Sequence, residues 1–191
     1  ANMKRLIIAA LVAFAGATQA TAATDDTAKE SKKTLIVYYS WGGNTRHVVE
    51  QIRKLIDAEV YELTPEKAYP TEYHQCTEVA KREKENNARP ALKGELPDLS
   101  KYDTVIVGFP IWWGTFPMLV ATFADAAEWK GKTVISFCTH GGGGAYDSDK
   151  DLQKLCPGAT FGKPFSAYGK GGSSLEKELR AWLSANKLSL K

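Results

Sequence analysis

Three short runs of the sequence are almost continuously apolar, and they constrain the fold more than any other feature. The runs are residues 35–39 (LIVYY), 104–109 (TVIVGF) and 133–138 (TVISFC). A strand with one solvated face alternates apolar and polar residues, whereas a continuous run is typical of a strand buried on both faces of a parallel sheet. Parallel neighbours need crossover connections, which are usually helices. The sequence therefore predicts an α/β fold.

Segments with helical periodicity lie between the predicted strands. Val48, Val49, Ile52, Leu55 and Ile56 recur at helical spacing after the first run. Alternation of strands and helices favours a parallel sheet with right-handed crossovers and helices on both faces, which is a three-layer α/β fold. Further helices are expected over 118–129 and 175–188, a second strand over 58–63, and a weaker last strand between 159 and 167.

Residues 64–100 form a polar, charged excursion where a crossover helix would be expected. We predict that it contains a helix from about Tyr73 to Glu85, followed by a loop through Arg89-Pro90. A second polar segment, with Asp147, Asp149 and Asp151, resembles the start of a calcium loop but lacks its later ligands. These aspartates are expected to cap the helix that follows.

The N-terminal residues have the three parts of a secretory signal peptide. Met3-Lys4-Arg5 is a basic start, residues 6–17 are apolar, and Ala20-Thr21-Ala22 offers small residues for cleavage before Ala23. Ala1-Asn2, ahead of the expected initiator, are interpreted as a short remnant. We therefore expect a signal peptide at 1–22, a polar linker at 23–33, a folded domain at 34–191, and export to the periplasm.

Charge and cysteine content exclude several classes of protein. The sequence has 25 basic and 22 acidic side chains, and cleavage removes two of the basic ones. The mature chain is therefore nearly neutral, and no nucleic-acid partner is expected. No apolar run is long enough to span a bilayer, so no stable membrane insertion is expected after cleavage. The three cysteines show no metal-site spacing. Unpaired Cys76, Cys138 and Cys156 are favoured, although Cys76 and Cys156 could pair if the fold brings them close.

Polar and glycine-rich turns follow three of the predicted strands, at the edge where parallel sheets bind ligands. The first, residues 40–45 (SWGGNT), combines hydroxyls, an amide and two glycines at the start of a helix. Such a turn can hold a phosphomonoester through its N–H groups and the helix dipole. An ordinary helix cap by Ser40 or Asn44 is the equal alternative. The spacing matches neither a Walker A loop nor a dinucleotide fingerprint.

The other two turns indicate a flat ligand. Residues 110–115 (PIWWGT) contain adjacent tryptophans, of which one is expected to pack in the core and one to stack on a planar group. The four glycines of residues 139–144 (THGGGG) leave a stretch of backbone without side chains, so that a flat ligand can approach it closely. Tyr146 could supply a second aromatic side chain beside that ligand. No residue stands out as a catalytic acid or base; His140 is equally compatible with a site near the ring and with a purely structural place in its loop.

Together these three motifs, each after its strand, resemble the three FMN-binding loops of the flavodoxin-like family, over roughly Thr34 to Lys187. The resemblance implies a doubly wound, five-stranded parallel sheet of order 2-1-3-4-5. It implies that the first turn holds the phosphate of FMN, that the second borders the isoalloxazine ring and that the third contacts its pyrimidine edge. It also implies that the Trp113–Gly114 peptide lies in a type I turn that can flip to type II. The predicted cofactor-binding residues are Ser40, Trp41, Gly42, Gly43, Asn44, Thr45, Pro110, Ile111, Trp112, Trp113, Gly114, Thr139, His140, Gly141, Gly142, Gly143 and Tyr146.

Two functions from different classes follow from the resemblance. The first is an electron carrier that uses bound FMN and docks with a redox partner protein. The alternative is an FMN-dependent NAD(P)H:quinone-type oxidoreductase with a small-molecule acceptor, and a non-catalytic flavin or phosphoester binding protein is a further possibility. In the first two cases the flavin carries the chemistry and the protein tunes it. Either a monomer or a homodimer is compatible with the sequence.

Overall fold

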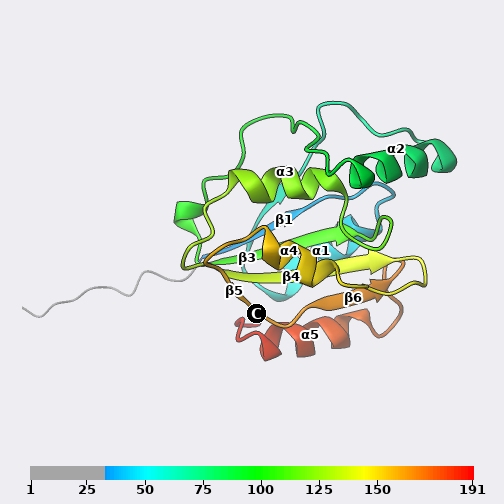
Figure 1. Ribbon diagram of the computed structural model, residues 1–191. Helices are drawn as coiled ribbons and strands as arrows, with labels where there is room; N and C mark the ends of the chain where they lie inside the picture. The colour runs from blue at the N-terminus through cyan, green and yellow to red at the C-terminus, as the bar shows by residue number, and fades with distance from the viewer. Residues whose placement is uncertain (1–32) are drawn as a thin grey trace, which may run out of the picture. The chain divides into compact units, whose positions relative to one another are not determined.

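The computed structural model describes residues 33–191, so the predicted signal peptide and all but the last residue of the linker lie outside the described residues. Strands and helices alternate along the described chain, as predicted (Figure 1). The strands are β1 (Thr34–Tyr38), β2 (Glu59–Glu62), β3 (Thr104–Pro110), β4 (Thr133–His140), β5 (Thr160–Phe161) and β6 (Phe165–Tyr168). The helices are α1 (Asn44–Leu55), α2 (Tyr73–Glu85), α3 (Met118–Ala126), α4 (Ser148–Lys154) and α5 (Leu175–Ala185), with one 3₁₀ turn at Leu99–Lys101.

All strand pairs in the sheet are parallel, in the order β2-β1-β3-β4-β5, with β6 also paired to β4. The predicted fold class and strand order are confirmed. The weak last strand is divided: β5 pairs with the start of β4 and β6 with its end. Pro164 lies in the gap and has no N–H to donate to a ladder. The Asn186 side chain closes the gap by accepting from the Lys163 amide (2.8 Å) and donating to the Lys163 carbonyl (3.1 Å).

Two hydrophobic clusters lie on opposite faces of the sheet and explain the continuous apolar runs. Ile36 and Ile106 pack with α1 and α5, whereas Leu35, Val37 and Val105 pack with α2, α3 and α4. Successive side chains of a strand point to opposite faces, so both registers must be apolar when helices cover both. Figure 1 shows α3 and α5 on the two sides of the sheet. The three layers are therefore α1/α5, the sheet, and α2/α3/α4.

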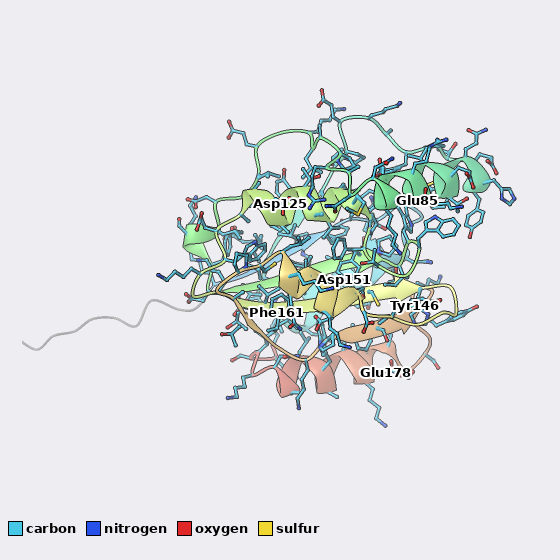
Figure 2. All side chains as sticks on the ribbon, in the orientation of Figure 1. Glu85, Asp125, Tyr146, Asp151, Phe161 and Glu178 are labelled. Carbon is cyan, nitrogen blue, oxygen red and sulfur yellow. The ribbon has the colours of Figure 1, made fainter. Side chains whose placement is uncertain are left out.

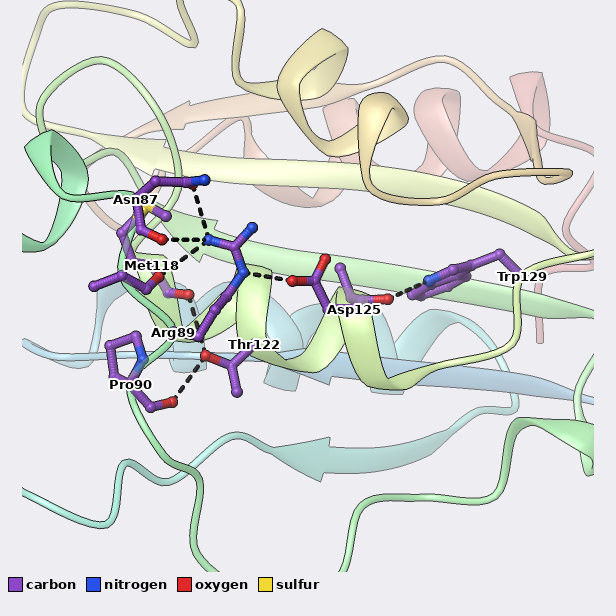
Figure 3. A network of polar contacts seen from close by, with 9 residues as sticks. Asn87, Arg89, Pro90, Met118, Thr122, Asp125 and Trp129 are labelled. Atoms are coloured by element: carbon purple, nitrogen blue, oxygen red, sulfur yellow. Dashed lines mark hydrogen bonds and ion pairs between the residues drawn. The ribbon is translucent and has the colours of Figure 1, made fainter.

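The polar excursion between β2 and β3 is attached to α3 by side-chain hydrogen bonds (Figure 3). Arg89 forms an ion pair with Asp125 of α3 (2.5 Å) and donates to the carbonyl and side chain of Asn87. The Thr122 hydroxyl donates to the Pro90 carbonyl (2.8 Å). The predicted helix of this excursion is confirmed as α2, with the predicted bounds. Because its loop is attached to α3, α2 has a defined place near the carboxyl ends of the strands (Figure 1).

Candidate functional site

A cleft of about 720 Å³ opens at the carboxyl ends of β1, β3 and β4, which is the edge where the sequence placed the three turns. Two of the predicted residues, Gly43 and Gly142, do not line it. The others all do: Ser40, Trp41, Gly42, Asn44, Thr45, Pro110, Ile111, Trp112, Trp113, Gly114, Thr139, His140, Gly141, Gly143 and Tyr146. The tertiary structure therefore brings the three turns together into one site.

Six further residues line the cleft that sequence reasoning missed. Four belong to α2: Tyr73, Cys76, Thr77 and Ala80. Cys76 and Ala80, four residues apart, are the buried face of an otherwise polar helix, and that spacing was the available signal. Tyr168 is the last residue of β6 and Gly169 follows it, so the rule that ligands bind at the carboxyl ends of parallel strands would have found them.

The first turn wraps around the Ser40 hydroxyl, which accepts from the amides of Gly43 (3.1 Å) and Arg46 (3.2 Å). Ser40, rather than Asn44, thus performs the capping role. Gly43 directly precedes α1 and has a φ of 91°, a left-handed conformation that glycine adopts without steric cost. Within residues 33–191, the amides of Asn44 and Thr45 have no hydrogen-bond partner. Both the cap and a free anion-binding helix start are present in this one turn.

Two buried hydroxyls meet beneath this turn. Thr45 Oγ1 and Thr139 Oγ1 are 2.9 Å apart, and they join the first helix to the end of β4. Each hydroxyl carries one hydrogen, so the pair uses one and leaves the other for a further acceptor. The site therefore offers two amides and one hydroxyl hydrogen at the same corner of the cleft.

The second turn is a two-residue hairpin closed by hydrogen bonds between Trp112 and Thr115 in both directions (2.8 and 3.3 Å). Trp113 has a φ of 54° and Gly114 a φ of 80°, which is the signature of a type I′ turn. The predicted type I turn, able to flip to type II, is therefore wrong. A flip from type I′ would give a type II′ turn, whose first central position favours glycine and here holds Trp113.

The two tryptophans have different surroundings, as expected from the sequence. Trp112 packs edge-on against the buried rings of Tyr69 and Tyr39, with centroids 4.9 and 5.6 Å away. Trp113 is 46% exposed and lies against α2. Its indole N–H donates to the Thr77 carbonyl (2.9 Å), and its own carbonyl accepts from the Lys84 ammonium group. Helix α2 therefore fixes the exposed tryptophan at the cleft.

The third loop is ordered by its own side chains. His140 Nδ1 accepts from the amides of Gly142 (3.2 Å) and Gly144 (3.3 Å). A Cβ on Gly143 would lie 2.3 Å from the Tyr146 hydroxyl, so only glycine lets that ring pack on the loop. Tyr146 lies at the end of the sheet where β4 finishes (Figure 2) and has a φ of 49°, which is strained for an aromatic residue.

Helix α4 supports the site from one side. Asp149 accepts from the Ser136 hydroxyl of β4 (2.5 Å), and Asp151 accepts from the Thr115 hydroxyl of the tryptophan turn (3.0 Å). Asp147 lies at the N-cap position of α4 without a side-chain capping bond. The predicted placement of these aspartates at the start of the helix is confirmed, but no capping hydrogen bond forms, and Asp149 and Asp151 instead tie the helix to the sheet and to the second turn.

The lining carries no Lys, Arg, Asp or Glu among the described residues. Its titratable groups are His140, Cys76 and three tyrosines. Burial raises the pKa of the Cys76 thiol to about 11, with a smaller effect from nearby Glu83. Cys138 and Cys156 are also buried, and all three cysteines are free, as favoured from the sequence. Within residues 33–191, no cluster of His, Cys, Asp and Glu could hold a metal ion, and no helix is both long and apolar enough to cross a membrane.

Comparison with known proteins identifies the family. No curated protein matches the chain. A candidate flavoprotein from Bacteroides uniformis is 32% identical over 78% of this chain and 98% of its own, with a TM-score of 0.71. A second, from Bacteroides eggerthii, is 28% identical over 82% and 99%, with a TM-score of 0.72. A flavoprotein from Lactobacillus acidophilus, solved in complex with FMN, is 23% identical over 80% and 99%, with a TM-score of 0.63. The flavodoxin family model matches residues 33–186, and the chain belongs to that family.

Proposed function

We propose that this chain binds FMN in the cleft and transfers electrons through it, as a carrier for a redox partner protein. The observation that carries the proposal is the division of one cleft into two chemically different ends. The free amides of Asn44 and Thr45, with the Thr45–Thr139 hydroxyl pair, suit a phosphate. The turn at Trp113 and the loop at His140 suit a flat ring.

The residues present fit FMN in charge and shape. A phosphate at the start of α1 would be held by N–H groups and the helix dipole, so the absence of Lys and Arg from the described lining is compatible with it. Gly143 leaves room for the Tyr146 ring on the third loop, and Trp113 and Tyr146 border the cleft from two separate turns. The family membership and the FMN complex of the Lactobacillus acidophilus neighbour support the same ligand. When bound, FMN supplies the one- or two-electron chemistry; the chain binds it, orients it and shields it from water.

A second candidate function is favoured by the rim of the cleft. In residues 33–191, five large apolar side chains are exposed, and four of them line this cleft. They are Tyr73 (64% exposed), Trp113 (46%), Tyr146 (65%) and Tyr168 (70%). Clustered exposed aromatics beside a cleft without ionised side chains suit an uncharged planar molecule. This observation favours an FMN-dependent oxidoreductase of the quinone-reducing type, with a small-molecule acceptor.

Stepwise reduction of the FMN-loaded protein tests both candidates. For a carrier we expect yellow colour on addition of FMN, followed by accumulation of one-electron-reduced flavin during photoreduction. For the oxidoreductase we expect direct passage to fully reduced flavin, and oxidation of a nicotinamide when a quinone is supplied. Failure to bind FMN would contradict both and leave the phosphoester-binding alternative.

We further propose that the chain is exported and works as the mature form beginning at Ala23. The basic start, apolar stretch and small-residue site support this, and Lys4-Arg5 is not a twin-arginine signal, so the chain would cross the membrane unfolded. Mass spectrometry of the envelope fraction should find a protein that begins at or near Ala23. Intact Met3 in the cytosol would contradict export.

A further inference from the structure

His140 is held in one tautomer by its own loop. Its Nδ1 accepts hydrogen bonds from two backbone amides, those of Gly142 (3.2 Å) and Gly144 (3.3 Å). A ring nitrogen that accepts N–H donors carries no proton, so the hydrogen of the neutral imidazole is on Nε2. The loop therefore fixes which edge of the ring accepts and which edge donates.

The Nε2 edge is left for a ligand. His140 lines the cleft, and Nε2 has no hydrogen-bond partner within residues 33–191. The backbone around the ring is fixed, because His140 pairs with Tyr168 in the β4–β6 ladder and the Gly169 amide donates to the His140 carbonyl (2.8 Å). The Tyr168 ring packs edge-on against the imidazole, with 6.2 Å between the centroids. The donor therefore has a defined position at the end of β4.

We propose that His140 is a positioning residue with two functions: Nδ1 holds the loop over 141–144 in its binding conformation, and Nε2–H donates to an acceptor atom on the pyrimidine edge of bound FMN. The inference rests on the proposed FMN binding. It replaces the two alternatives that the sequence left open, because His140 is both a structural part of its loop and a group at the ring.

Protonation of the ring opposes this arrangement. In the imidazolium form, Nδ1–H would face the N–H groups of Gly142 and Gly144, so both loop bonds are lost and the loop has to move. The loop therefore fits the neutral imidazole with its hydrogen on Nε2.

Nitrogen NMR of the flavin-free protein tests the tautomer directly. The chain has three histidines, and His140→Gln removes one set of ring signals and so assigns it. We expect an unprotonated Nδ1 and a protonated Nε2 for His140 at neutral pH. A proton on Nδ1 would overturn the inference without any measurement on flavin.

Two variants separate the two functions of the ring in riboflavin binding. Riboflavin has no phosphate group, so its affinity does not depend on the phosphate end of the cleft. His140→Asn keeps an acceptor where Nδ1 lies but removes the Nε2 donor, whereas His140→Gln keeps a donor near Nε2 but removes the loop acceptor. Each should weaken riboflavin binding about threefold to tenfold at about pH 8. His47→Asn, on α1 and outside the lining, is the matched control.

His47→Asn should bind riboflavin like the wild type, and His140→Asn with wild-type affinity would overturn the inference. Absence of any flavin binding would overturn the proposed function and the donor function with it, while the NMR result would still decide the loop function.

Discussion

Replacing Thr45 with Val is expected to weaken FMN binding about tenfold or more and to leave riboflavin binding near its wild-type value. Thr45 lies in the first turn of α1, next to the two free amides, and its hydroxyl pairs with that of Thr139. A hydrogen bond to a charged phosphate contributes roughly 1.5–3 kcal/mol, and Val keeps the shape of Thr while losing that bond. Titration of both flavins, followed by fluorescence, measures the two affinities.

The hydroxyl pair makes a sharper version of this experiment possible. One hydroxyl donates to the other, so Thr139→Val should weaken FMN binding too. Because the two residues act as a pair, the double variant should lose less binding free energy than the sum of the two single losses. Thr160→Val, on an exposed position of β5, is the matched control and should bind FMN like the wild type. Equal weakening of FMN and riboflavin by Thr45→Val would mean that the first turn does not hold the phosphate.

The thiols should react with iodoacetamide in a fixed order in the folded protein, with Cys76 first. Burial raises the pKa of Cys138 and of Cys156 to about 12, and that of Cys76 to about 11. The thiolate is the reactive form, so the raised pKa values should slow the alkylation of all three thiols near neutral pH. Only Cys76 lines the cleft, which adds access.

Bound FMN should protect Cys76 from alkylation, and Cys76→Ser should remove the fast reaction. In denaturant all three thiols should react at the ordinary rate, which controls for the reagent. Mass spectrometry of timed samples gives the order. Modification of Cys138 or Cys156 ahead of Cys76 would contradict the placement of α2 beside the cleft, and a disulfide between Cys76 and Cys156 would contradict the free thiols of the structure.

The periodicity of the sequence was sufficient to predict the layers. Continuous apolar runs at 35–39, 104–109 and 133–138 occur because helices cover both faces of the sheet. The bounds of α2 were also predictable, because helix-breaking residues flank its polar helical segment. Pro70 precedes it, and residues 86–90 (NNARP) are unfavourable for continuing a helix. The edge of the site followed from the same physics, because parallel strands end at one edge; the strand order that makes β1, β3 and β4 neighbours was implied by the resemblance to the flavodoxin-like family.

The sequence by itself therefore determined the sheet, its helices and the edge at which the cleft lies, since these depend on residues close together in the chain. The tertiary structure alone decided the rest. Trp113 is held in its left-handed conformation beside Thr77, 36 residues away, and Lys84, 29 residues away. The Thr45–Thr139 pair joins residues 94 apart. Such contacts form only when packing brings distant segments together, and no local pattern of residue types records which donor will then face which acceptor.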